Sequence, residues 1–279
     1  MIHLNLNLAL NQHLNDFVTC TVEGLSYIAT SKDNGVMREM YTRRVNFAAN
    51  EIKRFHELSK KYYNVDDSSG YFLDLGANIG TTGIYFIKKF APDLKLLAFE
   101  PDIETFKMLR LNMLLNDMED DKAVAVNCGL GDKHDKMTMY RRAHDPGANS
   151  VVQYVEGMPS ETIDIIPIDS YLAEKNIAAQ EVKYVWIDTE GFEPQVLLGA
   201  KNLLSENPVP LFVEYNMVTW RKSGLMEDTV ALLAKYYSHF INFDFGKETL
   251  YPLSELPNVE PWPGSWTRGD VFFIRHGLI

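Results

Sequence analysis

The stretch FLDLGANIGTTGIYF, residues 72–86, places an acid in front of a glycine turn. Asp74 lies two residues before Gly76, and the turn continues through Asn78 to Gly80. In the dinucleotide fingerprint G-x-G-x-x-G the middle glycine lets the backbone approach a pyrophosphate, and Asn78 occupies that position here. The Asn78 side chain hinders a phosphate and Asp74 would repel a diphosphate, so the turn favours a cationic ligand without phosphates. S-adenosylmethionine, which carries a sulfonium and an ammonium group, fits this description.

A second acid follows the next apolar run, in the sequence Phe99-Glu100-Pro101. A carboxylate there can accept hydrogen bonds from both hydroxyls of a ribose, and NAD enzymes use an acid in the equivalent place. Asp74 and Asn78 decide between the two cofactors, in favour of S-adenosylmethionine. The competing interpretations are that Asp74 caps a helix or stabilises the turn, and that Glu100 is a solvated strand end.

Further acids cluster after two other apolar runs. Asp188, Glu190 and Glu193 follow the run YVWI, and Glu214 ends the run VPLFV. Because the carboxyl ends of parallel strands meet at one edge of a sheet, these acids are expected at the mouth of a site. We expect Asp188 or Glu190 to act as a general base. Glu193 is a further candidate, although an acid in the first turn of a helix also stabilises that helix.

Two alternatives for the chemistry stay open. His144 has the ordinary pKa of a base, but the sequence His-Asp-Pro-Gly is typical of an exposed turn. Asp188 and Glu190 could instead hold Mg²⁺ or Ca²⁺, because hard oxygen atoms are the ligands these ions prefer. A metal site is not the favoured interpretation.

From residue 70 onward, short apolar runs alternate with segments of helical period, the pattern of βαβ units around a parallel sheet. We predict seven strands, at residues 71–75, 96–100, 123–128, 184–188, 209–214, 240–245 and 271–275. Helices are expected at residues 81–91, 102–116, 169–175 and 193–205.

Two parts of the chain lie outside this alternation. Residues 131–168 contain Pro146, Gly147, Pro159 and an alternating stretch at 160–166, which predicts a β-hairpin insertion that could cover a pocket. Residues 1–69, with a weak amphipathic helix at 47–58, are expected to form an N-terminal extension packed on the core. Residues 70–279 would then form one main domain.

Composition limits the partners. The 279 residues include 27 Lys and Arg against 38 Asp and Glu, and the net charge of -11 opposes binding to nucleic acid or to an anionic membrane. Cys20 and Cys128 are the only cysteines, which fits a reducing compartment. The start lacks a basic region, and no run of about 18 apolar residues occurs, so no membrane insertion is expected. The composition predicts a cytoplasmic protein without a nucleic-acid partner.

Taken together, four segments resemble the FkbM family of S-adenosylmethionine-dependent methyltransferases: FLDLGANIGTTGIYF, LLAFEPD with Asn112 downstream, YVWIDTEGFEPQVLLGA and VPLFVEYN. The family hallmarks are a D-x-G-A-N-x-G loop, an A-F-E-P strand end and an I-D-x-E-G-x-E segment that leads into V-L-x-G-A. The resemblance spans residues 72–216. The family commonly has Lys before the Ile of the third hallmark, where this chain has Trp186, and the substrate side is therefore less defined.

The resemblance implies an α/β fold of the class I methyltransferase (Rossmann-like) type, with a seven-stranded, mostly parallel sheet, an antiparallel last strand and helices on both faces. It also implies O-methylation of a hydroxyl on a sugar, a glycan or a related small molecule. The cofactor residues that it implies are Asp74, Gly76, Ala77, Asn78 and Gly80 around the methionine part, Glu100 and Pro101 at the ribose, and Asn127 or Cys128 beside the adenine.

The acceptor side is expected in the parts without recognisable motifs. Trp262 and Trp266 could form a platform for a sugar ring, or could simply fix a long loop to the core. An anionic acceptor could contact the segment that contains Met37, Arg38, Tyr41, Arg43 and Arg44, although a solvated helix face is the plainer interpretation. The rival functions are a non-catalytic cofactor-binding module of the same fold and, disfavoured by Asp74 and Asn78, an NAD-type oxidoreductase.

Overall fold

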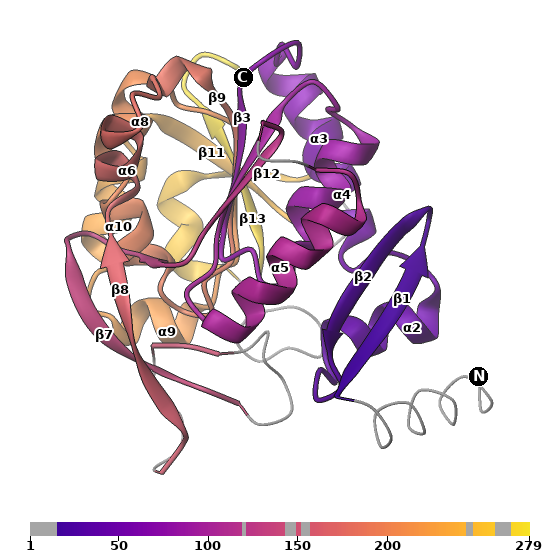
Figure 1. Cartoon of the computed structure of the whole chain (residues 1–279). Coiled ribbons are helices and arrows are strands. Elements are labelled where there is room, and N and C mark those ends of the chain that lie inside the picture. The colour runs from indigo at the N-terminus through magenta and orange to yellow at the C-terminus, as the bar shows by residue number, and fades with distance from the viewer. Residues whose placement is uncertain (1–15, 119–120, 143–148, 152–156, 244–247, 260–268) are drawn as a thin grey trace.

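The computed structural model describes residues 16–118, 121–142, 149–151, 157–243, 248–259 and 269–279. A central β-sheet runs through the molecule with helices on both of its faces (Figure 1). A hairpin and a short helix from the N-terminal part lie beside the helices on one face (Figure 1). Besides this core and the N-terminal part, the chain has an insertion with a small sheet of its own, described below.

The described part of the central sheet has eight strands in the order β12-β11-β13-β10-β9-β3-β4-β5. Their bounds are β3 (Tyr71–Leu75), β4 (Lys95–Phe99), β5 (Ala123–Val126), β9 (Val182–Ile187), β10 (Leu211–Val213), β11 (Tyr237–Asn242), β12 (Leu250–Pro252) and β13 (Val271–Arg275). β3 pairs in parallel with β4 and β9, whereas β13 is antiparallel to β10 and β11. The predicted mostly parallel sheet with an antiparallel last strand is confirmed.

The predicted number of seven strands is wrong by one. The additional strand, β12, pairs with β11 at the edge of the sheet. It has three residues and ends in Pro252, so it is too short to give the alternating pattern by which strands are found in a sequence. β12 is a strand only because its backbone pairs with that of β11, and this pairing is a tertiary contact.

Helices cover both faces of the sheet, as predicted. One face carries α3 (Ala49–Tyr63), α4 (Thr81–Lys89) and α5 (Ile103–Leu115), and the other carries α6 (Ile168–Glu174), α7 (Glu193–Leu198), α8 (Lys201–Glu206), α9 (Met217–Lys222), α10 (Met226–Leu233), η2 (Ala179–Glu181) and η3 (Leu253–Asn258). Successive strand residues alternate between the two cores: Phe72 and Phe212 belong to the first, and Leu73 and Val213 to the second.

The single helix predicted at 193–205 is two helices, α7 and α8. The interruption occurs at Gly199, where an added Cβ would lie 2.0 Å from the Gly131 carbonyl oxygen. The Asp169 carboxylate accepts hydrogen bonds from the backbone N–H groups of Asn202 and Leu203, at 2.7 and 3.0 Å. Asp169 thus caps α8 from another helix, a tertiary contact that the periodicity of the sequence does not contain.

The N-terminal part packs on the first core. Its elements are β1 (Phe17–Val22), β2 (Leu25–Thr30), which pairs antiparallel with β1, and α2 (Val36–Arg43). Phe55 of α3 is fully buried, with its ring centroid 5.5 Å from that of Trp186 and 6.2 Å from that of Phe212. The buried Asn112 of α5 donates to the carbonyls of Ile28 and Ile79 at 3.0 and 2.8 Å, which joins β2 to the glycine turn.

The hairpin predicted within residues 131–168 is present as β7 (Asp135–Tyr140) and β8 (Ser160–Ile166), and a third strand just before this segment, β6 (Gly129–Leu130), makes a second, three-stranded sheet. β7 and β8 are antiparallel, and β6 pairs in parallel with β8. Because β6 follows shortly after β5 in the chain, this insertion is joined directly to the carboxyl end of the central sheet.

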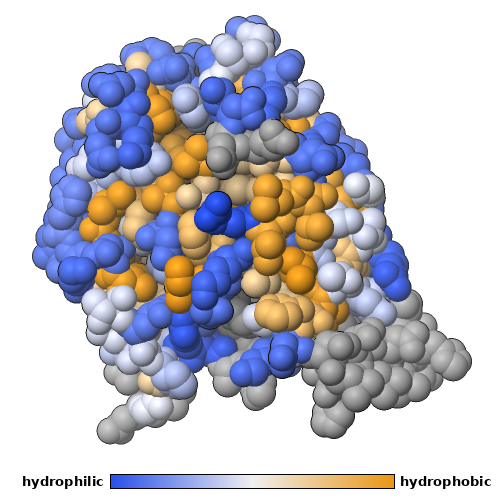
Figure 2. Space-filling view, viewed as in Figure 1, coloured by the Kyte–Doolittle hydropathy of each residue, from blue (hydrophilic) through white to orange (hydrophobic). Residues whose placement is uncertain are grey.

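The exposed face of α5 carries apolar side chains among charged ones, and Figure 2 shows an apolar area beside the centre of the view. Leu111, Leu114 and Leu115 are 42%, 62% and 51% exposed, whereas Met108, Leu109 and Met113 of the same helix are buried. Apolar side chains therefore occupy both sides of α5, which is why its sequence lacks a single clean stripe.

The turn after β3 passes very close to the end of β9. Gly76 has φ +95°, and an added Cβ would lie 1.8 Å from the Asp188 carbonyl oxygen. The Asp188 N–H donates to the Leu75 carbonyl at 2.9 Å, so the two backbones are held at this separation. A side chain at position 76 would have to separate the two strand ends.

We expect Gly76→Ala to lower the free energy of unfolding by at least about 3 kcal/mol, because backbone strain and a backbone clash add. Gly224→Ala is the matched control, since Gly224 also has a positive φ, +71°, but no atom within 4 Å of an added Cβ. It should cost about 1 kcal/mol. Urea denaturation followed by circular dichroism measures both, and equal losses would contradict the role of the close contact.

Candidate active site

The candidate site lies at the point where the strand order reverses, between β3 and β9. The chain proceeds from β3 to β4 and β5 on one side, and β9 and β10 lie on the other. In open α/β sheets, ligands bind in the crevice beyond the carboxyl ends of the strands at such a point. The residues that follow β3, β4, β9 and β10 are Gly76, Glu100, Asp188 and Glu214. The first three border the cavities described below, and Glu214 lies close to Asp188.

The glycine turn is stabilised by backbone bonds to the neighbouring strand. The N–H groups of Gly76 and Ala77 both donate to the Phe99 carbonyl, at 3.1 and 2.8 Å. Asn78 and Gly80 have φ values of +50° and +89°, which turn the chain into α4. Gly76 and Asn78 border both of the first two cavities, and Ala77 borders the second.

Asp74 is buried beneath the turn, with 1% of its surface exposed. Its Oδ2 accepts a hydrogen bond from the Gly83 N–H at 2.9 Å, in the first turn of α4. Burial raises the pKa of Asp74 to about 7, the Gly83 N–H lowers that pKa, and the charge of Asp188 raises it. The contact seen is that of a turn-stabilising acid, and direct contact of Asp74 with a cofactor stays a prediction.

Glu100 connects the end of β4 to both neighbouring loops. Its Oε2 accepts from the Asn78 N–H at 2.9 Å, and its Oε1 accepts from the Asp102 N–H at 2.8 Å. The side chain is mostly buried, and this burial raises its pKa to about 8 against the lowering effect of the two N–H groups. Asn127, at the end of β5, donates to the carbonyls of Glu100 and Pro101, both at 2.9 Å, so it supports this loop.

The first cavity is a small slot of about 70 Å³ beside Glu100. Its walls are mainly apolar and come from two sides: Phe99, Pro101, Cys128 and Phe192 from the core, and Leu130, Met139, Val151, Ile163 and Ile165 from the insertion and its sheet. Gly76, Asn78, Asp188 and Glu190 are among the residues that complete its border.

Polar contacts fix the insertion over this slot. Arg141 lies between two acids, with Nε 2.7 Å from Asp102 Oδ2 and a terminal nitrogen 2.7 Å from Glu161 Oε2. Ser150 Oγ donates to the Glu190 carbonyl at 2.8 Å. Sequence reasoning assigned no role to Arg141 or Ser150, because their partners are distant in the chain.

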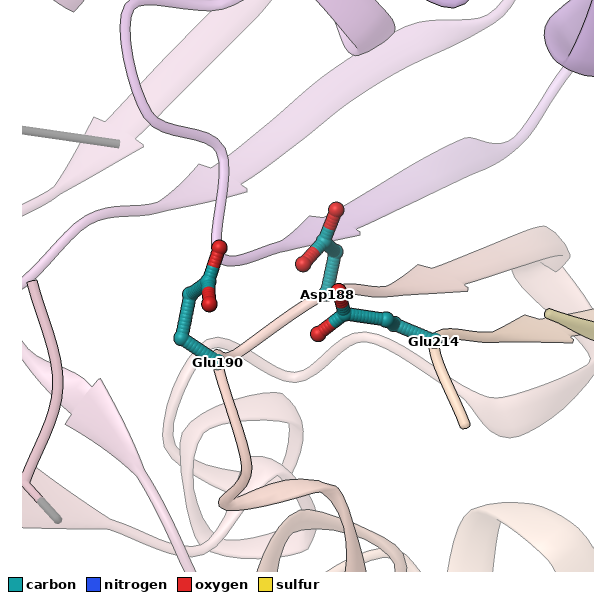
Figure 3. Close-up of side chains that lie close together, drawn as sticks. All are labelled: Asp188, Glu190 and Glu214. Atoms are coloured by element: carbon teal, nitrogen blue, oxygen red, sulfur yellow. The ribbon is translucent and has the colours of Figure 1, made fainter. Parts of the chain in front are cut away.

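Three carboxylates gather after β9 and β10. Figure 3 shows Asp188, Glu190 and Glu214 pointing toward one another, each with a ligand oxygen within 4.8 Å of the others. Glu190 has φ +51° and is followed by Gly191 at φ +101°, a sharp turn that directs its side chain back toward Asp188. Three carboxylates at this separation form an acidic cluster, whose negative charge favours a cationic group nearby.

Glu193, a candidate base from the sequence, instead fixes the loop that carries the other acids. It is fully buried, and its Oε1 accepts from the N–H groups of Thr189 and Gly191, each at 3.0 Å. Its Oε2 accepts from Trp220 Nε1 at 3.3 Å. Burial raises the pKa of Glu193, although the backbone N–H groups lower it. Glu193 is thus a positioning residue in this structure, and it borders neither of the first two cavities.

A second cavity, of about 550 Å³, adjoins the slot at Gly76, Asn78, Asp188 and Glu190. Its opposite wall is α2, through Arg38, Glu39, Thr42 and Arg43, together with Phe47. Trp186, which stands where the resemblance leads one to expect Lys, borders this cavity and stacks on Phe212 with ring centroids 3.5 Å apart.

The remaining acceptor-side candidates separate in the structure. Met37 is fully buried in the core, and the Arg44 guanidinium lies 4.7 Å from the centre of the Tyr41 ring. Only Arg38 and Arg43 of this group border the second cavity. His144, Trp262 and Trp266 lie outside the described residues.

A sheet of this order, with a glycine turn after β3 and an acid after β4, defines a class I methyltransferase fold. A family model described as "Methyltransferase FkbM domain" matches residues 74–240, more than half of the chain. The chain belongs to the FkbM methyltransferase family, as the sequence motifs predicted.

Similar proteins include methyltransferase sdnD of Sordaria araneosa, 26% identical over 193 residues, 60% of this chain and 72% of sdnD. Methyltransferase 1 of Beauveria bassiana (strain ARSEF 2860) is 26% identical over 153 residues, 48% of this chain and 59% of the relative. A solved FkbM methyltransferase from Methylobacillus flagellatus KT is 16% identical, with a TM-score of 0.47, over 86% of this chain and 55% of that one. The chain thus spans little more than half the length of two of these three proteins.

Within the described ranges, no helix is both long enough and apolar enough to span a lipid bilayer.

The raised pKa of Glu100 predicts a pH dependence of nucleoside binding. The ionised carboxylate accepts hydrogen bonds from hydroxyls, and in the free protein its proton is lost only near pH 8. The affinity for 5′-methylthioadenosine, which has a ribose but no group that titrates between about pH 6 and pH 9, should therefore fall by up to about tenfold per pH unit below pH 8. Calorimetric titration from pH 6 to pH 9 measures this.

The control for this measurement is Glu100→Gln, which removes the group that titrates near pH 8 and should bind more weakly, with a flat profile from about pH 8 to pH 9. A flat profile for the unaltered protein, or an affinity that falls as the pH rises, would contradict the assignment of Glu100 to the ribose.

Proposed function

We propose that this chain is an S-adenosylmethionine-dependent O-methyltransferase that acts on a hydroxyl of a sugar, a glycan or a related small molecule. The observation that carries the proposal is the junction of the two cavities. The slot beside Glu100 and the larger cavity share Gly76, Asn78, Asp188 and Glu190. Together the cavities fall within the size range of small-molecule sites, about 300–1,000 Å³. A cofactor on one side and an acceptor on the other would meet at the acids.

The residues present suit the cofactor. The apolar walls of the slot suit a purine ring, and the Glu100 carboxylate has lone pairs beyond those used by its two backbone donors. The slot is smaller than an adenosine, so we expect the side chains that the insertion contributes to move apart on binding. The negative charges of Asp188 and Glu190 favour a sulfonium at the junction, whereas they would repel the pyrophosphate of NAD.

When bound, S-adenosylmethionine supplies the methyl group and becomes neutral S-adenosylhomocysteine, because the electron pair of the broken C–S bond stays on sulfur. The protein's task is to hold the acceptor hydroxyl in line with that bond and to take its proton. Asp188 and Glu190 border both cavities and carry acceptor oxygens for this proton. Glu193 acts through them, since it fixes the backbone of the loop from which they project.

A second use of the same acids is the metal alternative. Asp188, Glu190 and Glu214 provide three hard oxygen ligands, the type that Mg²⁺ and Ca²⁺ prefer. An ion bound there would lower the pKa of an acceptor hydroxyl, and a carboxylate base would then not be needed to remove the proton. We favour the carboxylate base, and the turnover measurement below separates the two.

The first test is a calorimetric titration with S-adenosylmethionine, S-adenosylhomocysteine and NAD. We expect dissociation constants on the order of 1 μM for the first two and no binding of NAD, for the charge reason given above. Binding of NAD alone, or of none of the three, would overturn the proposed cofactor.

The second test addresses the base. Asp188→Asn and Glu190→Gln should retain affinity for S-adenosylhomocysteine within about twofold, and at least one should lower turnover by about 100-fold or more. Turnover is the transfer of labelled methyl from S-adenosylmethionine to a small-molecule extract, measured with Mg²⁺ and with EDTA. We expect the same rate in both, whereas loss of activity in EDTA and recovery with Mg²⁺ would favour the metal alternative.

The matched control is Asp228→Asn, which makes the same change at an exposed position of α10. If both site variants turned over like this control, the catalytic assignment would be wrong. If the unaltered protein bound S-adenosylmethionine but transferred no methyl group, a non-catalytic module would be the better description.

A further inference from the structure

We propose that the methyl acceptor carries an anionic group, a carboxylate or a phosphate, which binds to Arg38 and Arg43 on α2. Its hydroxyl would then lie at the opposite side of the larger cavity, beside Asp188 and Glu190. This inference rests on the proposed methyltransferase function and names the class of acceptor for the same site.

The two arginines border the same cavity from α2. Arg38 and Thr42, and likewise Glu39 and Arg43, are four residues apart, so these side chains lie next to each other over one turn of the helix. All four border the cavity of about 550 Å³ that adjoins the slot. The side of the helix that carries them is therefore part of a cavity wall and not only a solvated face.

Contacts on the other side of α2 fix this wall in place. Met37 and Met40 are fully buried, and the buried Asp33 carboxylate accepts from the N–H groups of Gly35 and Met37 at 3.0 and 3.2 Å. Asn46, which follows the helix, donates to the Thr81 carbonyl at 3.0 Å. Because Thr81 is the first residue of α4, the wall is fastened directly to the glycine turn.

The cavity holds charges of both signs. The chain has a net charge of -11, yet α2 presents two guanidinium groups and the Glu39 carboxylate to a cavity that Arg142, Asp188 and Glu190 also border. A guanidinium offers paired N–H donors that match the oxygens of a carboxylate or a phosphate. The carboxylates would repel the same anion, so the cavity favours one orientation of an acceptor that has a hydroxyl at one end and an anion at the other.

Arg43 is not locked in its present contact. It forms an ion pair with Glu39 at 3.0 Å, but the two side chains are 69% and 36% exposed. Exposed pairs of this kind contribute only about 0–1 kcal/mol, so an anionic ligand can compete for the guanidinium. Arg38 is likewise exposed and sits one turn before Thr42 on the same wall.

The cofactor itself carries a carboxylate, which gives a rival use for the arginines. A double variant, Arg38→Gln with Arg43→Gln, separates the two uses. S-adenosylhomocysteine has the amino-acid carboxylate and 5′-methylthioadenosine lacks it, so calorimetry with both ligands reports whether the arginines hold the cofactor. The control is Arg110→Gln, which removes the same charge from an exposed position of α5 outside this cavity.

The acceptor is then tested without knowing its identity. Each protein transfers labelled methyl from S-adenosylmethionine to a small-molecule extract of its source cells, and the products are separated on an anion exchanger at pH 7. An O-methylated product keeps its anion, so the label should be retained by the resin. We expect the double variant to lower this retained label by at least about tenfold, with unchanged affinity for S-adenosylhomocysteine, and Arg110→Gln to behave like the unaltered protein.

Two results would overturn the inference and leave the proposed function standing. One is binding of S-adenosylhomocysteine with a labelled product, distinct from unreacted S-adenosylmethionine, found only in the unretained fraction, or retained label that the double variant does not change. The other is a double variant that loses affinity for S-adenosylhomocysteine while binding 5′-methylthioadenosine normally, which would assign the arginines to the cofactor. Failure of the unaltered protein to bind S-adenosylhomocysteine would instead overturn the proposed function, on which the inference rests.

Discussion

The site depends on the close passage of the turn after β3 against the end of β9. At Gly76 the two backbones leave no space for a Cβ. The Asp188 N–H donates a hydrogen bond to the Leu75 carbonyl, which holds the two strand ends together. This contact places the residues that follow both strands at one point of the sheet edge. The slot, the larger cavity and the acid cluster all share residues from that point. The remaining elements position groups around it.

The acids of the site differ in their burial and in their hydrogen bonds to backbone N–H groups, and these differences determine what each acid can do. Asp74 and Glu193 are buried and accept hydrogen bonds from main-chain N–H groups, so each is used to hold a loop. Glu100 is intermediate, because it holds two loops and also borders the slot. Asp188 and Glu190 are partly exposed at the junction of the cavities. Residues of one chemical type thus differ in function through their surroundings.

Two segments outside the sheet complete the cavities by different means. The insertion contributes apolar side chains to the slot and is attached by Arg141 and Ser150 to the loops that follow β4 and β9. The N-terminal part contributes a charged wall and is attached by amide side chains, Asn46 and Asn112, to the backbone around the glycine turn. Both are therefore held by polar contacts to loops that border the junction.

The sequence determined the elements that local pattern controls. Apolar runs, the glycine turn and the acids at strand ends predicted the positions of the main strands along the chain, the fold class and the family. Each of these features is contained within a short stretch of sequence. The tertiary structure alone decided what depends on distant partners. Asp169 caps the second of the two helices found in the segment 193–205, and β11 provides the partner for β12. Glu193 could not be distinguished from a base until its buried donors were seen, and Arg38 could not be assigned to a cavity until α2 was packed against the sheet. The burial of a side chain and the set of charges around a cavity depend on segments that are distant in the chain, so they cannot be predicted from a local sequence pattern.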